Sequence, residues 1–264
     1  MAMQTIRLDQ TAGTARISLA RASVHNAFDD VLIAELTATL EQVEADPTVR
    51  AVVLTGEGST FSAGADLGWM RRMAQASEDE NREDSLKLAK LMRTLNFLSK
   101  PTLARVNGSA YGGGVGLVAC CDYAIGVESA KFSLSEVKLG LVPAVISPYV
   151  TAAIGPRHAR RLFTGAEVIE AQEARAIGLL HTLAPAAELD AVVDRALHFW
   201  AKGGPVAQQE AKQLALRTAG FTRETAERID TENAALIARL RVSPEGQEGL
   251  TAFLDKRAPG WVTS

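Results

Sequence analysis

The sequence predicts an α/β fold with a parallel sheet and a helical C-terminal region. Short apolar runs typical of buried strands alternate with helical patterns up to about residue 130, which is the arrangement of βαβ units. From about residue 145 onward almost every segment follows the helical period instead. We therefore expect an α/β core over residues 1–200 and a helical region over residues 201–264.

The N-terminal segment supplies the first strands and the first helix. Two short apolar runs, at residues 6–8 and 14–19, predict strands on either side of a glycine turn. Asp29 or Asp30 can cap a helix in which apolar residues recur at helical spacing up to about residue 45.

The middle of the chain repeats the alternation of strand and helix. Uninterrupted apolar runs at residues 51–55, 102–106 and 123–127 are typical of strands that are buried on both faces. Helical patterns occupy residues 85–98, after a polar stretch, and residues 115–121, after a run of glycines. This order predicts neighbouring parallel strands joined by helices.

Helical periodicity dominates the last third of the chain. Pro156 stands at one expected helix start, and further helices are expected at residues 189–201, 206–217 and 223–240. A Gly-Gly-Pro sequence that begins at residue 203 separates the first two of these. The chain contains no internal repeat and no low-complexity tract.

Composition and charge argue against several function classes. The 264 residues carry a formal net charge of −3, whereas nucleic-acid-binding domains are typically basic. No stretch approaches the roughly 18 apolar residues of a membrane-spanning helix, and the first ten residues lack the apolar core of a signal peptide. We therefore expect a cytoplasmic protein without a nucleic-acid or membrane partner.

Common motifs for cofactors and metals do not occur in the sequence. The run Gly112–Gly116 departs from G-x-G-x-x-G because residue 117 is leucine. P-loop, nucleophile-elbow and H-E-x-x-H motifs are missing, and the four histidines are scattered. Cys120 and Cys121 are adjacent and match neither a zinc nor a redox spacing, so we expect buried thiols. No metal and no separate cofactor are expected.

Two turns rich in glycine and alanine indicate a site. Residues 61–67 follow the strand at 51–55, and residues 111–116 follow the strand at 102–106 and open a helix. Both turns should therefore lie at the carboxyl edge of a parallel sheet, where α/β proteins bind ligands. Main-chain N–H groups in such turns can form an oxyanion hole. The alternative is that the small residues only allow a helix to pack closely on the sheet.

At these residues the sequence resembles the crotonase superfamily, also called the enoyl-CoA hydratase/isomerase family. The resemblance runs nearly end to end and rests on five motifs in the family's order: RASVHNAF (Arg21–Phe28), FSAGADL (Phe61–Leu67), VNGSAYGGGVGLVACCD (Val106–Asp122), KFSLSEVKLGLVP (Lys131–Pro143) and FLDKRAPGW (Phe253–Trp261). Within the family the chain is most similar to bacterial 3-methylglutaconyl-CoA hydratases, with carboxylated-terpenoid-CoA hydratases close behind.

The resemblance implies a fold and an assembly. The expected fold is a crotonase-like spiral of ββα units, with a helical C-terminal region that builds trimers, which are commonly paired as hexamers. The implied substrate is an acyl-CoA thioester, so that coenzyme A is part of the substrate and not a cofactor.

The resemblance also assigns roles to residues. Ala65 and Gly113 match the two residues whose N–H groups bind the thioester oxygen, and Glu136 matches the second of two catalytic glutamates. The remaining matches concern substrate binding: Val24 and Ala27 along the coenzyme A, Ala63, Asp66 and Leu67 around its pantetheine, Tyr111, Gly112 and Ser135 at the pocket, and Phe253, Lys256 and Arg257 as a C-terminal patch that often reaches a neighbouring subunit's coenzyme A.

One position departs from the hydratase pattern. Hydratases usually carry their first glutamate in the helix after the triple glycine, where this chain has Gly116. Gly116 lies one helical turn beyond Gly113, so we expect it to face the same pocket and to widen it for a branched or carboxylated acyl chain. Tyr111, or a carboxylate on the substrate, would then help to hold the attacking water.

Each candidate side chain has a second interpretation. Glu136 lies in an apolar stretch, so burial should raise its pKa towards neutrality, as suits an acid–base catalyst; an ion pair with Lys131 or Lys138 is the alternative. Asp66 is expected to cap a helix or brace its loop, with catalysis as the alternative. Trp69 and Met70 are expected to line the acyl pocket.

These observations predict an acyl-CoA hydro-lyase. It would hydrate an α,β-unsaturated, branched or carboxylated enoyl-CoA, of the 3-methylglutaconyl type, through an oxyanion hole and one glutamate. A double-bond isomerase on the same scaffold is the first alternative, because the first glutamate is missing. A protein that binds coenzyme A esters with little catalysis is the second.

Overall fold

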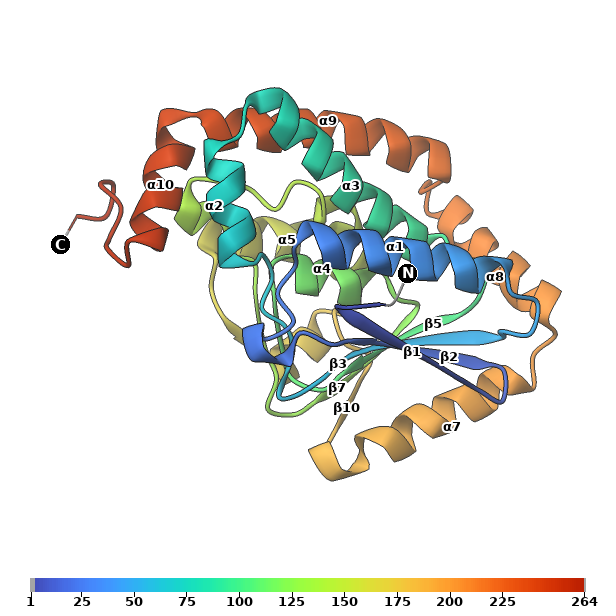
Figure 1. Ribbon diagram of the computed structural model, residues 1–264. Helices are drawn as coiled ribbons and strands as arrows, with labels where there is room; N and C mark the ends of the chain where they lie inside the picture. Colours follow the sequence, from blue (N-terminus) through green and yellow to red (C-terminus); the bar gives the residue numbers. More distant parts are fainter. Residues whose placement is uncertain (1–2, 264) are drawn as a thin grey trace.

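Two β-sheets form the frame of the protein, which the computed structural model describes for residues 3–263 (Figure 1). The larger sheet has the strand order β1-β2-β3-β5-β7-β10 and is parallel except for the pair β1–β2. Its strands are β1 (Ile6–Thr11), β2 (Thr14–Leu19), β3 (Ala51–Gly56), β5 (Thr102–Val106), β7 (Tyr123–Val127) and β10 (Thr182–Ala184).

The smaller sheet has the order β4-β6-β8-β9. Its strands are β4 (Thr60–Ser62), β6 (Ser109–Tyr111), β8 (Lys131–Ser133) and β9 (Ile169–Glu170). Strands β4, β6 and β8 are parallel neighbours, and each follows at once on a strand of the larger sheet. Every such strand pair is followed by a helix, so the expected spiral of ββα units is confirmed.

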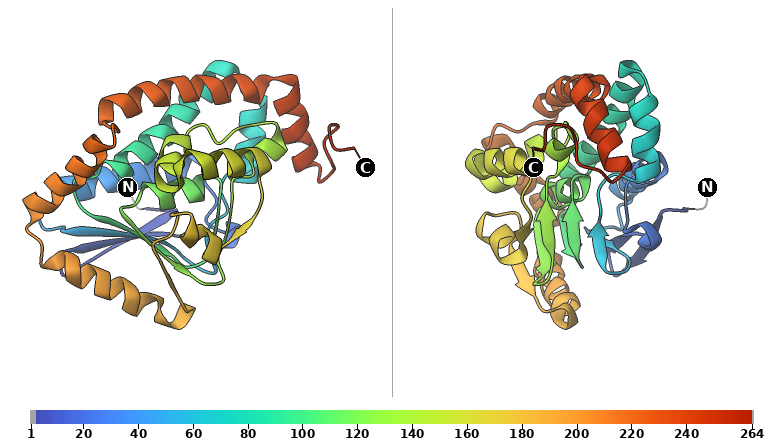
Figure 2. Two further views of the ribbon diagram at one scale, coloured as in Figure 1. Left: turned by 180° about the vertical axis from the view of Figure 1, so that it is seen from behind. Right: turned by 90° about the vertical axis from the view of Figure 1, so that its left-hand side faces the viewer.

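The helices cover both faces of the larger sheet. They are α1 (Asp30–Ala45), α2 (Leu67–Gln75), α3 (Glu78–Asn96), α4 (Gly113–Cys120), α5 (Ser147–Gly165), α6 (Ala171–Ala176), α7 (Leu189–Ala201), α8 (Pro205–Thr218), α9 (Arg223–Val242) and α10 (Pro244–Leu254). In Figure 1, α1, α3 and α9 lie on one side of the sheet and α7 on the other. Figure 2 shows α9 running along α3, with α10 folded back beside α2.

Most of the expected elements are present. Helix α1 begins at an Asp29 N-cap, whose Oδ1 accepts a hydrogen bond from the Leu32 N–H at 2.8 Å. Pro156 does mark a helix start, because Gly155 breaks α5 with a φ of 74° and the second half of the helix begins behind it.

Other elements were predicted wrongly or missed. Helix α3 begins at Glu78 instead of residue 85, because Ser77 and Glu80 form a capping box that fixes a polar first turn. The two- and three-residue strands of the smaller sheet were missed, since so short a run has no readable period. Helix α2 was missed too, because it lies directly against the glycine-rich turn.

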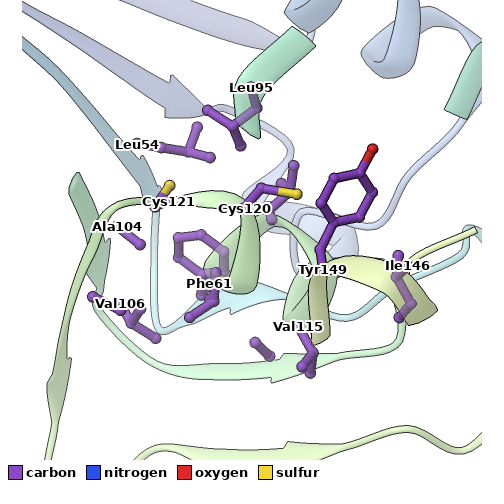
Figure 3. Packing of buried hydrophobic residues seen from close by; sticks show 14 of the residues in the cluster. Leu54, Phe61, Leu95, Ala104, Val106, Val115, Cys120, Cys121, Ile146 and Tyr149 are labelled. Atoms are coloured by element: carbon purple, nitrogen blue, oxygen red, sulfur yellow. The ribbon is translucent and has the colours of Figure 1, made fainter. Parts of the chain in front are cut away.

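Much of the apolar core lies between the larger sheet and the helices α1, α3 and α4. Figure 3 shows Leu54, Phe61 and Val106 packed against side chains from α3, α4 and α5. Cys120 and Cys121 are both free and buried within this core, as expected. Burial raises the pKa of the Cys121 thiol to about 12, so both are inert packing groups.

Within residues 3–263, no helix is long and apolar enough to cross a membrane.

Candidate active site

The two predicted turns meet at one edge of the smaller sheet. Each follows a short strand, β4 or β6, rather than directly following a strand of the larger sheet as expected. The two strands are parallel neighbours, so the turns still lie side by side. A Cβ placed on Gly64 would come within 2.9 Å of the Tyr111 carbonyl oxygen. The contact between the turns therefore requires a residue without a side chain.

The N–H groups of Ala65 and Gly113 donate to no residue in the described part of the chain. Phe28 holds the first turn, since its N–H donates to the Gly64 carbonyl at 2.6 Å and its carbonyl accepts from the Asp66 N–H at 2.8 Å. This pairing leaves the Ala65 N–H without an acceptor among residues 3–263. Gly113 is the first residue of α4, where an N–H has no acceptor within the helix. Both residues line one cavity, as an oxyanion hole requires.

Close packing fixes the second turn. Gly112 adopts a φ of 47° that other residues rarely adopt, and its N–H donates to the Ser133 carbonyl at 3.0 Å. A Cβ on Gly113 would lie 2.7 Å from Cε2 of Phe28. Any side chain at residue 113 would therefore displace the backbone that carries the N–H donor.

Glu136 is the candidate acid–base group of the cavity. It begins a short 3-10 helix, Glu136–Leu139, directly after Ser135, and both residues line the cavity. Its Oε2 is buried and has no hydrogen-bond partner among the described residues. Burial raises the pKa of Glu136 to about 7, as predicted from the apolar stretch. A carboxyl group with this pKa can both accept and return a proton near neutral pH.

The alternative ion pairs of Glu136 do not form. Lys131 lies 3.2 Å from Glu170 instead, and Lys138 is exposed and makes no ion pair in the described part of the chain. The carboxyl group of Glu136 is therefore not held by a cation and stays available to a substrate.

Asp66 has a structural role, as expected. Its Oδ1 accepts hydrogen bonds from the N–H groups of Gly68 and Trp69, at 2.8 and 3.1 Å, and so caps α2. Its Oδ2 lies 3.1 Å from Nη2 of Arg21. Burial alone would raise the pKa of Asp66, but these hydrogen bonds and the guanidinium outweigh it and lower the pKa. A carboxylate so fully engaged braces the first turn.

Gly116 does not face the cavity, contrary to the prediction. It follows Gly113 by one helical turn, yet it does not line the cavity. A Cβ on Gly116 would overlap Cγ2 of Ile146, with the Ile146 Cβ at 2.9 Å and Cε of Met92 at 3.3 Å. The expectation that Gly116 widens the pocket is therefore wrong, because Ile146 fills that space and itself forms part of the cavity wall.

The remaining predicted residues divide into two groups. Ala63, Tyr111 and Gly112 line the cavity, whereas Asp66, like Gly116, is not part of its wall. Outside the cavity wall lie Val24, Ala27, Leu67 and Lys256. Of these, Ala27 is buried, while the other three are exposed. Their contact with coenzyme A stays a prediction.

The cavity extends from the two turns to the helical layer and has a volume of about 330 Å³. Trp69 and Met70 are part of its wall, as expected. The other apolar residues of the wall are Phe28, Met73, Leu88, Leu139, Leu141, Val142, Pro143, Ala144, Val145, Ile146, Ile237, Leu250, Phe253 and Pro259.

Arg241 of α9 also lines the cavity, and the sequence reasoning missed it. It is one charge of many on a long helix, and no motif distinguishes it.

A metal site is not formed by the described residues. No group of three or more His, Cys, Asp or Glu side chains within residues 3–263 is arranged to hold a metal ion.

Comparison with known proteins identifies the family. Residues 9–264 match the family "Enoyl-CoA hydratase/isomerase". A crotonyl-CoA hydratase of Syntrophomonas wolfei is 31% identical over 265 residues, covering 100% of both chains. A 2,3-dehydroadipyl-CoA hydratase of Escherichia coli is 32% identical over 248 residues, covering 92% of both chains. The crystal structure of an enoyl-CoA hydratase from Shewanella pealeana is 41% identical, with a TM-score of 0.80 over 98% of this chain and 96% of that one. The chain therefore belongs to the enoyl-CoA hydratase/isomerase family of enzymes.

Proposed function

We propose that the protein is a hydro-lyase that adds water to an α,β-unsaturated acyl-CoA thioester. One observation carries the proposal: Glu136, with a buried and unpartnered carboxylate oxygen, lines the same cavity as the free N–H groups of Ala65 and Gly113. Two fixed donors and one acid–base group are what the chemistry requires, because charge develops on the thioester oxygen while a proton moves at carbon.

A single carboxylate is enough to move the proton that the addition of water requires. The thioester oxygen accepts hydrogen bonds from Ala65 and Gly113, which makes C3 of the enoyl group electrophilic. Ionised Glu136 removes a proton from water as the hydroxide adds to C3, and an enolate forms. The protonated Glu136 then gives that proton to C2, so that H and OH have both been added and the carboxylate is restored. Tyr111 lines the cavity and is the proposed second contact of the water.

A double-bond isomerase is the second candidate. The same glutamate would remove a proton from one carbon and return it to another, with no water consumed. The observation that favours it is Ile146, an apolar side chain that packs on Gly116, the position where hydratases usually carry a first glutamate. A pure binding protein is disfavoured, because binding alone gives no reason to bury an unpartnered Glu136.

The acyl chain is proposed to be branched or carboxylated, as in a 3-methylglutaconyl-CoA-like substrate. The volume of about 330 Å³ supports a chain longer than a crotonyl group, although Gly116 contributes no space. The Escherichia coli relative is named for a dehydroadipyl group, which ends in a carboxylate.

A homotrimer or homohexamer is the proposed assembly, and the cytoplasm is the proposed location. Within α9 and α10, Ala234 and Leu250 are buried in the chain itself and are not available to an interface. Support comes instead from α7 and α8, where Phe199 and Val206 are each 70% exposed and Leu214 is 54% exposed. Light scattering should give three or six times the chain mass of 28.1 kDa at micromolar concentration, and a monomer mass would contradict the proposal.

A panel of enoyl-CoA thioesters tests the function. Each compound is assayed for hydration by loss of the conjugated enoyl absorbance, and for double-bond migration by chromatography of the products. We expect 3-hydroxyacyl-CoA as the main product, and none from Glu136→Gln. Shifted double bonds without hydration would establish the isomerase, and turnover of neither kind would refute both.

A further inference from the structure

The wall of the cavity contains a positive charge. Arg241 projects from α9 into a wall that is otherwise mostly apolar, one helical turn after Ile237 on the same face of the helix. Its side chain is only 14% exposed, and its Cζ lies 5.7 Å from the centre of the Trp69 ring. Burying a guanidinium here is costly unless a partner compensates it.

The guanidinium is only partly engaged by the protein. Nη1 donates to Oδ1 of Asn81 at 3.1 Å. The same Nη1 lies 3.7 Å from Oδ2 of Asp84, too far for a hydrogen bond. Nε and Nη2 donate to no residue within the described range 3–263. Two neighbouring N–H groups of this kind form the fork that binds a carboxylate with two hydrogen bonds.

Asp84 makes only a long contact with Arg241. Its Oδ1 accepts from Nε1 of Trp69 at 3.2 Å, while its Oδ2 is buried without a hydrogen bond in the described structure. Burial raises the pKa of Asp84, although Arg241 and Trp69 oppose the shift. Because Asp84 contacts only Nη1, and at 3.7 Å, it leaves Nε and Nη2 free to donate to a second carboxylate.

The other cations of the cavity wall are less suited to a ligand in its interior. Arg257 makes two hydrogen bonds to Glu248, at 2.7 and 2.8 Å, which occupy its fork. Lys138 is exposed, so water hydrates its charge. Arg241 is therefore the cation among them that is both enclosed and incompletely paired.

We propose that Arg241 binds a carboxylate at the far end of the acyl chain and thereby selects dicarboxylic enoyl-CoA thioesters. The proposal rests on the proposed function, since it places the thioester at Ala65 and Gly113 and the acyl chain in the cavity. It adds the residue that recognises the charge and the geometry of that recognition, a two-bond contact from Nε and Nη2.

A purely structural role of Arg241 predicts a different result. Asn81, which accepts from Arg241, also donates to the carbonyls of Met73 and Ala76 at the end of α2, and Gln247 donates to the Arg241 carbonyl at 2.7 Å. If Arg241 only braces α2, its loss should weaken charged and uncharged ligands equally. The ratio between two matched ligands therefore separates the two roles.

Calorimetry with non-reacting ligands measures that ratio. Glutaryl-CoA and pentanoyl-CoA have five-carbon chains and differ in a terminal carboxylate against a methyl group. We expect the wild-type protein to bind glutaryl-CoA about 10–100-fold more tightly, in line with charged hydrogen bonds. Arg241→Met should abolish this preference while pentanoyl-CoA binding changes less than about threefold, and Arg241→Lys should retain only part of it. Arg239→Met is the control, because Arg239 lies exposed on the same helix without an ion pair in the described structure.

Kinetics with glutaconyl-CoA and 2-pentenoyl-CoA extend the test to turnover. We expect Arg241→Met to lower the ratio of their kcat/KM values by about 10–100-fold. If Arg241→Met does not fold, Asp84→Asn serves instead, and it should tighten glutaryl-CoA binding several-fold because the competing acid is gone.

The outcomes separate this inference from the proposed function. An Arg241-dependent preference for glutaryl-CoA without hydration would support the carboxylate subsite and refute the hydratase. Equal wild-type binding of glutaryl-CoA and pentanoyl-CoA would overturn the subsite and leave the hydratase intact. Equal losses for both ligands in Arg241→Met would assign Arg241 to the bracing of α2.

Discussion

The two ends of the cavity are built in different ways. At the reaction end, the backbone N–H groups of Ala65 and Gly113 come from turns that follow adjacent strands of one sheet. At the acyl end, side chains from α2, α9 and α10 form the wall, among them Trp69, Arg241 and Leu250. The reaction end is a local product of strand and turn, whereas the acyl end depends on helices that are distant in sequence. This difference suggests that the chemistry is fixed by the sheet and the substrate is chosen by the helices.

Removing the acid–base group should affect the reaction end most strongly. We expect Glu136→Gln to lower kcat by about 1,000-fold or more, because general acid–base catalysis is worth roughly 100- to 10,000-fold, while glutaryl-CoA binding persists. Glu128→Gln is the matched control, since Glu128 is exposed and forms no ion pair in the described structure. Steady-state kinetics with calorimetry of both variants checks this, and near-normal turnover in folded Glu136→Gln would remove Glu136 from the mechanism.

Displacing one N–H donor should have the next largest effect. In Gly113→Ala the added Cβ would lie 2.7 Å from Phe28, so the turn has to move and the donor with it. Loss of one oxyanion donor costs about 100–1,000-fold in kcat. Gly165→Ala is the control, because its Cβ would meet nothing closer than 3.8 Å. If kcat of Gly113→Ala stays within about threefold of wild type, the oxyanion hole is misassigned.

Substitution of Gly116 tests whether the pocket has space at this position. Gly116→Glu forces a charged side chain onto Ile146 and Met92, so we expect a stability loss of at least about 3 kcal/mol. Adding Ile146→Ala makes room and should recover part of that loss. Urea unfolding of both variants measures it. A single Gly116→Glu variant as stable as wild type would mean that the pocket has space at residue 116 after all.

The raised pKa of Glu136 makes both activity and stability depend on pH. Hydration begins with the ionised form, so kcat/KM should rise with pH to a plateau above pH 7, given a pKa of about 7. The same pKa exceeds the ordinary value of 4.5, so the folded state favours protonated Glu136. Its stabilising effect is complete below pH 4.5, falls as pH rises to about 7, and totals about 3 kcal/mol.

Glu136→Gln should remove this pH-dependent loss of stability. The variant should therefore gain about 3 kcal/mol over wild type at pH 8 and nothing at pH 4. Denaturant titrations at the two pH values measure the difference. An equal change at both would show that Glu136 titrates normally in the fold.

The parallel frame and most of the reaction end could be predicted from the sequence. The apolar runs at residues 51–55, 102–106 and 123–127 are the parallel strands β3, β5 and β7, which are neighbours in the sheet as expected. The environment of Glu136 and the cap formed by Asp66 were also predicted. Each of these depends on residues close together in the chain, where period, turn and capping rules apply.

Only the tertiary structure decided the role of Gly116 and the nature of the acyl end. Ile146 lies 30 positions after Gly116 and Arg241 lies 160 positions after Asn81, yet each pair is in contact. The smaller sheet likewise exists only because strands of two or three residues align side by side. One chain carries no signal for such contacts, since whether a space is filled or a charge is paired depends on which distant side chains arrive there after folding. The sequence by itself therefore determined the frame and its candidate catalytic group, and packing between distant helices decided the shape and charge of the candidate substrate pocket.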